Sequence, residues 1–170
     1  MFKWLTNMAD RRHNFTIFPQ SYKYGCWLAA THSMNMYNLY WGYYPGMPWP
    51  VSLYDNSVNY YDSWLGENQG LLMDSETLTS FASKNNFQYQ RLYGDTSVIS
   101  SKIGQSPIMV AGRLAGSGND SHFFVITGVK DGKVYYSDPK PDGQASSGVT
   151  TFAAFKQKHP NAFDHAFWWA

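Results

Sequence analysis

The chain has 170 residues, of which 44% are hydrophobic and 15% charged, so it is neither a disordered segment nor a highly charged tail. Its length suits one folded domain, and its formal net charge of +1 provides no strong field for nucleic acid or an anionic lipid surface. The single cysteine, Cys26, excludes an intramolecular disulfide and a zinc site built on several cysteines.

Sequence signals for a membrane, a secretory route or a cofactor are missing. No run of about 18 apolar residues exists, so we expect no membrane span. Residues 1–7 lack the continuous apolar core of a signal peptide, which predicts synthesis in the cytoplasm and leaves export to a dedicated secretion system. The chain has no P-loop and no Gly-x-Gly-x-x-Gly fingerprint, and its five histidines lack the helical spacing of a zinc protease, so we expect no cofactor and no metal.

The N-terminal half is predicted to be helical with long loops. We expect an irregular arm over residues 1–19, a helix over 26–39 and an aromatic, Pro-rich loop over 43–70. The apolar residues of the first helix do not form one narrow stripe, which is typical of a helix buried on several sides. Asp74 is a good N-cap for a second helix that runs to about Lys84, with Leu78, Phe81 and Ala82 on its buried face.

The C-terminal half is dominated by strand patterns. We expect strands over residues 87–92, 107–111, 122–129, 133–138 and 166–169, with short helices between Asp95 and Gly104 and over 152–158. Helices followed by mainly antiparallel strands indicate the α+β class. We expect one domain over residues 1–170, with a helical lobe at about 1–86 and a mainly β lobe at about 87–170.

Cys26 is the candidate nucleophile. A lone cysteine is usually a small buried hydrophobe, but this one opens a predicted helix directly after Gly25. The partial positive charge at a helix N-terminus favours the thiolate, which is the nucleophilic form. Gln20 lies six residues upstream, and its amide can join the Cys26 N–H in an oxyanion hole, although most glutamines lie on the surface.

His122 is the candidate base, because it follows a Gly-rich loop and begins a strong strand. Asp138 ends the next strand and is the candidate to orient the imidazole. We expect a three-residue loop over 130–132, which would set Asp138 across from Phe124 and make Asp138 a diagonal neighbour of His122, about 7–8 Å away at the backbone. The other histidines are less suited: we expect His32 to point away from Cys26, and His13, His159 and His165 to lie on the surface or partly buried.

Two segments carry a resemblance to a known family. The run from Gln20 to Trp27 (QSYKYGCW) resembles the active-site segment of papain-like cysteine peptidases, in which a glutamine precedes a Cys-Trp pair by the same interval. The run from Ser121 to Val129 (SHFFVITGV), followed by Tyr136 to Pro139 (YSDP), resembles the compact bacterial branch, which includes bacteriocin-processing peptidases and effector-type papain-like proteases. Plant papains have asparagine where Asp138 stands.

The resemblance implies a helical N-terminal lobe, with the central helix starting at Cys26, packed on an antiparallel β-sheet lobe. It also implies a cysteine peptidase with Cys26 as nucleophile, His122 as base, Asp138 as orienting residue and Gln20 as oxyanion donor. A papain-like amidase, deamidase or transglutaminase acting on peptidoglycan peptides or glutamine side chains is an alternative, and so is a non-catalytic binding module. The implied partners are a protein or peptide substrate and, for a secreted bacterial effector or toxin, an immunity protein or an activating factor.

Overall fold

The computed structural model describes residues 13, 15, 17, 25–40, 71, 73–113, 121–139 and 145–170, with side chains in the first helix described as far as Tyr37. The helices are α1 (Cys26–Tyr40), α3 (Ser75–Lys84), α4 (Ser97–Lys102) and α5 (Phe152–Lys158). The strands are β1 (Gln88–Arg91), β2 (Ile108–Arg113), β3 (Ser121–Lys130), β4 (Lys133–Asp138), β5 (Ser146–Thr151) and β6 (His165–Trp168). The expected loop at 43–70 lies outside the described residues.

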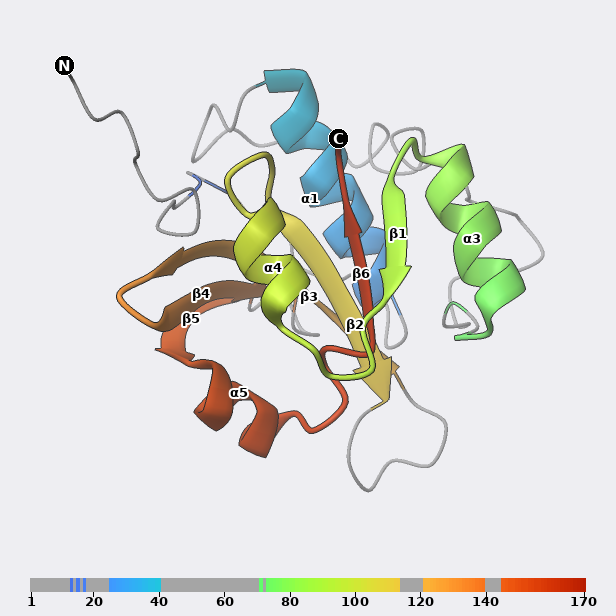
Figure 1. Ribbon diagram of the computed structural model, residues 1–170. Coiled ribbons are helices and arrows are strands. Elements are labelled where there is room, and N and C mark those ends of the chain that lie inside the picture. The colour runs from blue at the N-terminus through green and yellow to red at the C-terminus, as the bar shows by residue number, and fades with distance from the viewer. Residues whose placement is uncertain are drawn as a thin grey trace, which may run out of the picture.

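The strands form one antiparallel sheet in the order β1-β6-β2-β3-β4-β5 (Figure 1). The long strand β3 lies between β2 and β4, so its residues are buried along most of its length. Helices that precede an antiparallel sheet confirm the predicted α+β class. The division into lobes at about residue 86 stays a prediction.

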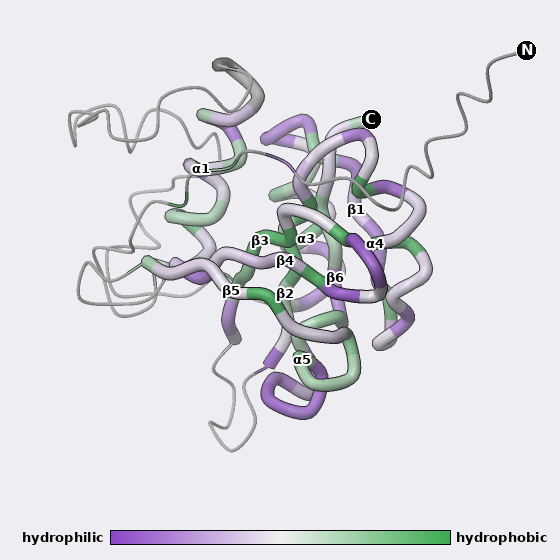
Figure 2. Tube along the Cα trace, turned by 90° about the vertical axis from the view of Figure 1, so that its left-hand side faces the viewer, coloured by the Kyte–Doolittle hydropathy of each residue, from purple (hydrophilic) through white to green (hydrophobic). Residues whose placement is uncertain are grey.

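Helices cover both faces of the sheet. α1 and α3 pack on the face that carries Met109, Ala111, Phe123, Val125 and Phe167, and these residues share one hydrophobic cluster with the helices. α4 and α5 pack on the other face, which carries Val110, Phe124, Ile126, Val134 and Ala166. Side chains alternate along a strand, so β2 and β3 contribute to both clusters. Figure 2 shows the resulting hydrophobic stretches of β2 and β3 in the middle of the molecule.

The central helix α1 is buried on several sides, as its sequence predicts. Ala29, Ala30 and Met34 are fully buried, and small residues let the helix approach the sheet closely. Two buried hydroxyls are satisfied within the helix: Thr31 donates to the Trp27 carbonyl at 2.7 Å, and Ser33 donates to the Ala29 carbonyl at 2.7 Å. Because these bonds satisfy both hydroxyl groups, the two polar residues are tolerated at buried positions of the helix.

The predicted helix caps are largely confirmed. The Asp74 side chain accepts a hydrogen bond from the Thr77 N–H at 2.8 Å, and the buried residues of α3 are Leu78, Phe81 and Ala82. Asp95 also accepts a backbone N–H, from Ser97 at 2.8 Å, but the N-cap position of α4 belongs to the following residue, Thr96. α5 spans the predicted residues 152–158.

Strand β5 was not predicted from the sequence. Its residues alternate between half-buried and exposed positions and include Val149, which is 52% exposed, so the segment lacks a hydrophobic pattern. It lies at the edge of the sheet, where only one neighbour, β4, supplies hydrogen bonds. Gly148 lies opposite Tyr136 in this pairing, and an added Cβ there would come within 2.6 Å of the tyrosine ring.

Gly112 is the tightest backbone position of the sheet. It pairs with His122, and an added Cβ would lie 1.4 Å from the Asn161 carbonyl oxygen. We expect Gly112→Ala to lower the free energy of unfolding by about 3 kcal/mol, because backbone has to move. Gly148→Ala is the matched control, since there the added Cβ meets the far end of a side chain, the Tyr136 ring, and not backbone. Chemical denaturation measures both, and equal losses would contradict this difference.

Candidate active site

Cys26 is the first residue of α1, and the structure holds it at the end of the sheet where β3 begins. Its side chain is buried, and its Sγ lies 3.9 Å from the Ser121 carbonyl oxygen. The Gly25 carbonyl accepts the hydrogen bond of the Ala29 N–H at 3.0 Å, so the first turn of the helix starts directly at the cysteine. The sulfur therefore lies beside the free N–H groups at the start of a 15-residue helix.

His122 lies between Cys26 and Asp138. The His122 Nε2 and Asp138 Oδ1 atoms are 2.6 Å apart, and the two side chains are only 15% and 11% exposed. The Cys26 side chain lies close enough to the His122 ring to raise the pKa of that ring. Because Nε2 faces the carboxylate, Nδ1 is the ring nitrogen left for another partner.

A β-bulge brings His122 and Asp138 to the same face of the sheet. The turn has two residues, Asp131 and Gly132, with φ angles of 51° and 71°, and Lys130 pairs with Lys133. The predicted three-residue loop is therefore wrong. The register shifts between Ile126 and Gly128, so that Val125 pairs with Ser137, and Asp138 comes level with Phe124 as expected.

The environment of His122 stabilises its protonated form. Burial lowers the pKa, but the hydrogen bonds to Asp138 and Cys26, together with the charges of these two groups, outweigh it and raise the pKa of His122 from 6.5 to about 10. The ring also contacts Phe124 edge-on at a centroid distance of 4.6 Å. Phe124 is itself fixed against Phe155 at 5.1 Å and His159 at 4.7 Å, so it limits rotation of the imidazole.

This raised pKa predicts a pH dependence. Because the folded-state pKa is the higher one, the stabilisation from protonated His122 is complete below pH 6.5 and is lost as the pH rises through about 10. In an NMR titration of the histidine ring protons, His122 should titrate near pH 10. Cys26→Ala should lower that pKa, because it removes the sulfur's hydrogen bond and charge. An identical titration in the variant would contradict a direct contact between the two side chains.

The remaining predicted site residue, Gln20, lies outside the described residues. Of the other histidines, His32 is buried within α1, which lowers its pKa to about 4. His165 was expected on the surface or partly buried, but it is 5% exposed, because β6 lies inside the sheet between β1 and β2. Its Nδ1 lies 3.0 Å from the Tyr89 hydroxyl, and burial together with the charge of Arg91 lowers its pKa to about 4.

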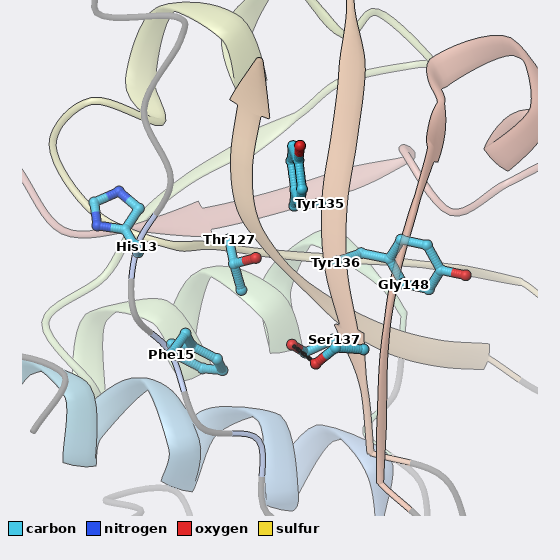
Figure 3. A pocket seen from close by; sticks show the side chains of 8 residues that line it. His13, Phe15, Thr127, Tyr135, Tyr136, Ser137 and Gly148 are labelled. Atoms are coloured by element: carbon cyan, nitrogen blue, oxygen red, sulfur yellow. Dashed lines mark hydrogen bonds between the residues drawn. The ribbon is translucent and has the colours of Figure 1, made fainter. Parts of the chain in front are cut away.

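A separate polar cavity of about 240 Å³ lies over strands β3 to β5 (Figure 3). Its lining includes His13, Phe15, Thr127, Tyr135, Tyr136, Ser137, Ser147 and Gly148. The Ser137 and Ser147 hydroxyls lie 3.0 Å apart. The lining does not include Cys26, His122 or Asp138.

Neither a metal centre nor a membrane helix is found in the described part of the chain. No group of three or more His, Cys, Asp or Glu side chains there is arranged to hold a metal ion. None of the helices described there is long and apolar enough to cross a bilayer.

Comparisons with known proteins give a consistent picture. A family model described as "Papain-like cysteine protease AvrRpt2" matches residues 6–159. The search of curated proteins finds no match. The peptidase domain of Streptococcus ComA, a bi-functional ABC transporter, is similar in structure with a TM-score of 0.53 and 14% identity, over 91% of this chain and 96% of that chain.

Two further solved structures share the fold. A double glycine motif protease from an AMS/PCAT transporter, in complex with its leader peptide, has a TM-score of 0.51 at 14% identity, over 92% of this chain and 91% of that one. The peptidase domain of Streptococcus mutans ComA with a small-molecule inhibitor has a TM-score of 0.53 at 13% identity, over 92% and 99%. These likenesses show the fold, and the family match covers most of the sequence. The chain therefore belongs to the papain-like cysteine protease AvrRpt2 family and is a cysteine peptidase.

Proposed function

We propose that this peptidase hydrolyses peptide bonds with Cys26 as nucleophile, His122 as acid and base, Asp138 as orienting residue and Gln20 as oxyanion donor. The observation that carries the proposal is the position of His122, which hydrogen-bonds Asp138 and lies close enough to Cys26 for that side chain to raise its pKa. An imidazole held between a thiol and a carboxylate is the arrangement that activates a cysteine nucleophile.

In the proposed reaction, the Cys26 thiolate attacks the carbonyl carbon of the scissile bond. The resulting oxyanion accepts hydrogen bonds from the Cys26 N–H and the Gln20 amide. Protonated His122 gives its proton to the leaving amine as the C–N bond breaks, which leaves a thioester. His122 then takes a proton from water, whose oxygen attacks the thioester, and the acid product leaves as the thiolate and protonated imidazole are restored.

Asp138 accepts the hydrogen bond of Nε2–H throughout this cycle. The carboxylate keeps Nδ1 directed at the sulfur and stabilises the imidazolium. The high pKa of His122 favours the protonated imidazole before substrate arrives. The residues of this scheme need no metal or organic cofactor.

We propose a protein or peptide as the substrate, since the double glycine motif protease that shares the fold was solved with a leader peptide. We also propose that residues 1–170 act as one catalytic domain with lobes at about 1–86 and 87–170. A role as a secreted bacterial effector or toxin, with an immunity protein or an activating factor as partner, is proposed from the likeness to the compact bacterial branch. Export by a dedicated secretion system would fit that role.

The test is to incubate a proteome and purified cell wall with wild type or with Cys26→Ala, followed by mass spectrometry. New backbone termini that depend on Cys26 would support the peptidase. Conversion of glutamine to glutamate, cleavage confined to peptidoglycan peptides, or new isopeptide links would assign the deamidase, amidase or transglutaminase alternative. The absence of any difference between the two proteins would leave only a binding role.

A further inference from the structure

A cation at the end of β2 lies opposite the residue whose carbonyl oxygen is next to the candidate nucleophile. Arg113 is the last residue of this strand and pairs with Ser121, whose carbonyl oxygen lies 3.9 Å from Cys26 Sγ. Residues directly opposite in an antiparallel pair have Cα atoms about 4.5–5.5 Å apart. Arg113 is therefore one strand away from the residue that touches the sulfur.

The side chain of Arg113 leaves the sheet on the face that α1 covers. Paired residues share a face, so Arg113 lies on the same side as Ser121, and Ala111, two positions earlier, belongs to the same hydrophobic cluster as Cys26. The five preceding residues of β2 are buried, whereas Arg113 is exposed. Figure 1 shows the arrowhead of β2 at the same end of the molecule as the first turn of α1. Arg113 therefore lies at the point where this face of the sheet becomes exposed to solvent, on the side of the sheet that carries Cys26.

Within the described part of the chain, no carboxylate forms an ion pair with the Arg113 guanidinium. The backbone of Arg113 is nevertheless fixed, because its carbonyl accepts a hydrogen bond from Asn161 Nδ2 at 3.2 Å in addition to the strand pairing. Arg91, which lies two strands away on β1, differs: its guanidinium sits over the Tyr93 ring at 4.6 Å. Burial raises the pKa of the Asp164 carboxyl overall, although the charges of Arg91 and Arg113 both reach this group and lower its pKa. Arg113 is thus a cation at the end of β2 without a direct ion pair among the described residues.

We propose that Arg113 is a specificity-determining residue that binds a carboxylate of the substrate, so that the enzyme prefers peptides with Asp or Glu close to the scissile bond. The proposal rests on the proposed function, because it takes Cys26 as the nucleophile. Arginine is suited to this role, since its planar guanidinium can donate two parallel hydrogen bonds to one carboxylate.

The first test measures the electrostatic potential around Cys26 and needs no substrate. Iodoacetate and iodoacetamide alkylate the same thiol but differ in charge, so the ratio of their rate constants reports the local potential. We expect Arg113→Gln to reduce the iodoacetate-to-iodoacetamide ratio about fivefold, as for a partly screened charge several ångströms from the sulfur. Arg91→Gln is the matched control and should leave the ratio nearly unchanged. An unchanged ratio in Arg113→Gln would overturn the proposal, even if no peptide substrate were known.

The second test uses peptide pairs that differ by a single Glu or Gln at each position near a cleaved bond. Wild type should cleave one Glu peptide faster than its Gln partner, and Arg113→Gln should remove that preference. Arg113→Glu should prefer the matching Lys peptide, which a purely structural role would not produce. Cleavage by wild type without any preference for the acidic peptides would overturn the role of Arg113 and leave the proposed peptidase standing. Cleavage that persists in Cys26→Ala would instead overturn the proposed catalytic function.

Discussion

Replacing Cys26 with alanine is expected to lower kcat/KM for peptide-bond hydrolysis by at least about 10⁴-fold. Alanine cannot form the thioester, and no other cysteine exists in the chain to replace it. The substitution removes one sulfur atom from a buried position, so the fold should be retained with a modest change in stability. Activity against a cleaved peptide and circular dichroism measure the two effects.

The matched control for this experiment is Cys26→Ser, which keeps the size of the side chain. A hydroxyl is a much weaker nucleophile in a site built for a thiolate, so this variant should also be nearly inactive. If either folded variant were as active as wild type, Cys26 would be excluded as the nucleophile. It would leave the fold assignment untouched, because that rests on the family match and the sheet topology.

Asp138 gives the second large effect. Asp138→Ala removes the acceptor of the His122 Nε2–H bond, and we expect kcat/KM to fall about 10²-fold. Asp138→Asn keeps an acceptor oxygen but loses the charge, so its loss should stay within about tenfold. The graded result follows from the hydrogen bond and the charge of Asp138, since both variants leave Cys26 in place.

The pKa of His122 provides an independent measurement of the same contact. Because the hydrogen bond and charge of Asp138 raise this pKa, it should fall in Asp138→Asn and fall further in Asp138→Ala. Asp131→Asn, in the turn of the same hairpin, removes a carboxylate from an exposed position and should change neither activity nor the titration of His122. Equal activities of the alanine and asparagine variants would argue against the orienting role.

Much of the fold could be predicted, because the local signals for helix caps and strands agree with the positions of the buried residues. Asp74 caps α3 where the sequence places an N-cap, and the segments predicted as strands at 122–129 and 133–138 form β3 and β4. Strand β5 could not be predicted, because an edge strand with an exposed Val149 carries no hydrophobic alternation. The burial of His165 could not be predicted either, since only the strand order shows that β6 is an inner strand.

The segments that form the candidate site were predictable, but their geometry was not. The helix start at Cys26 and the strand at His122 can be read from the sequence, as can the Asp-Pro segment that ends β4. The bulge could not be predicted, because threonine is an ordinary strand residue. The register shift at Thr127 shows only in the pairing of β3 with β4. The contact between Ser121 and Cys26, on which the assignment of Arg113 depends, likewise requires coordinates.

The bulge decides whether the two side chains share a face of the sheet. The ladder skips Thr127, so deleting this residue would restore regular pairing and leave Asp138 level with Phe124, on the same face as His122. A hairpin with the same two-residue turn in which Thr127 paired with Tyr136 would instead set Asp138 level with Val125, on the opposite face and out of reach of His122. The candidate site therefore depends on the skipped pair and tolerates the loss of the skipped residue.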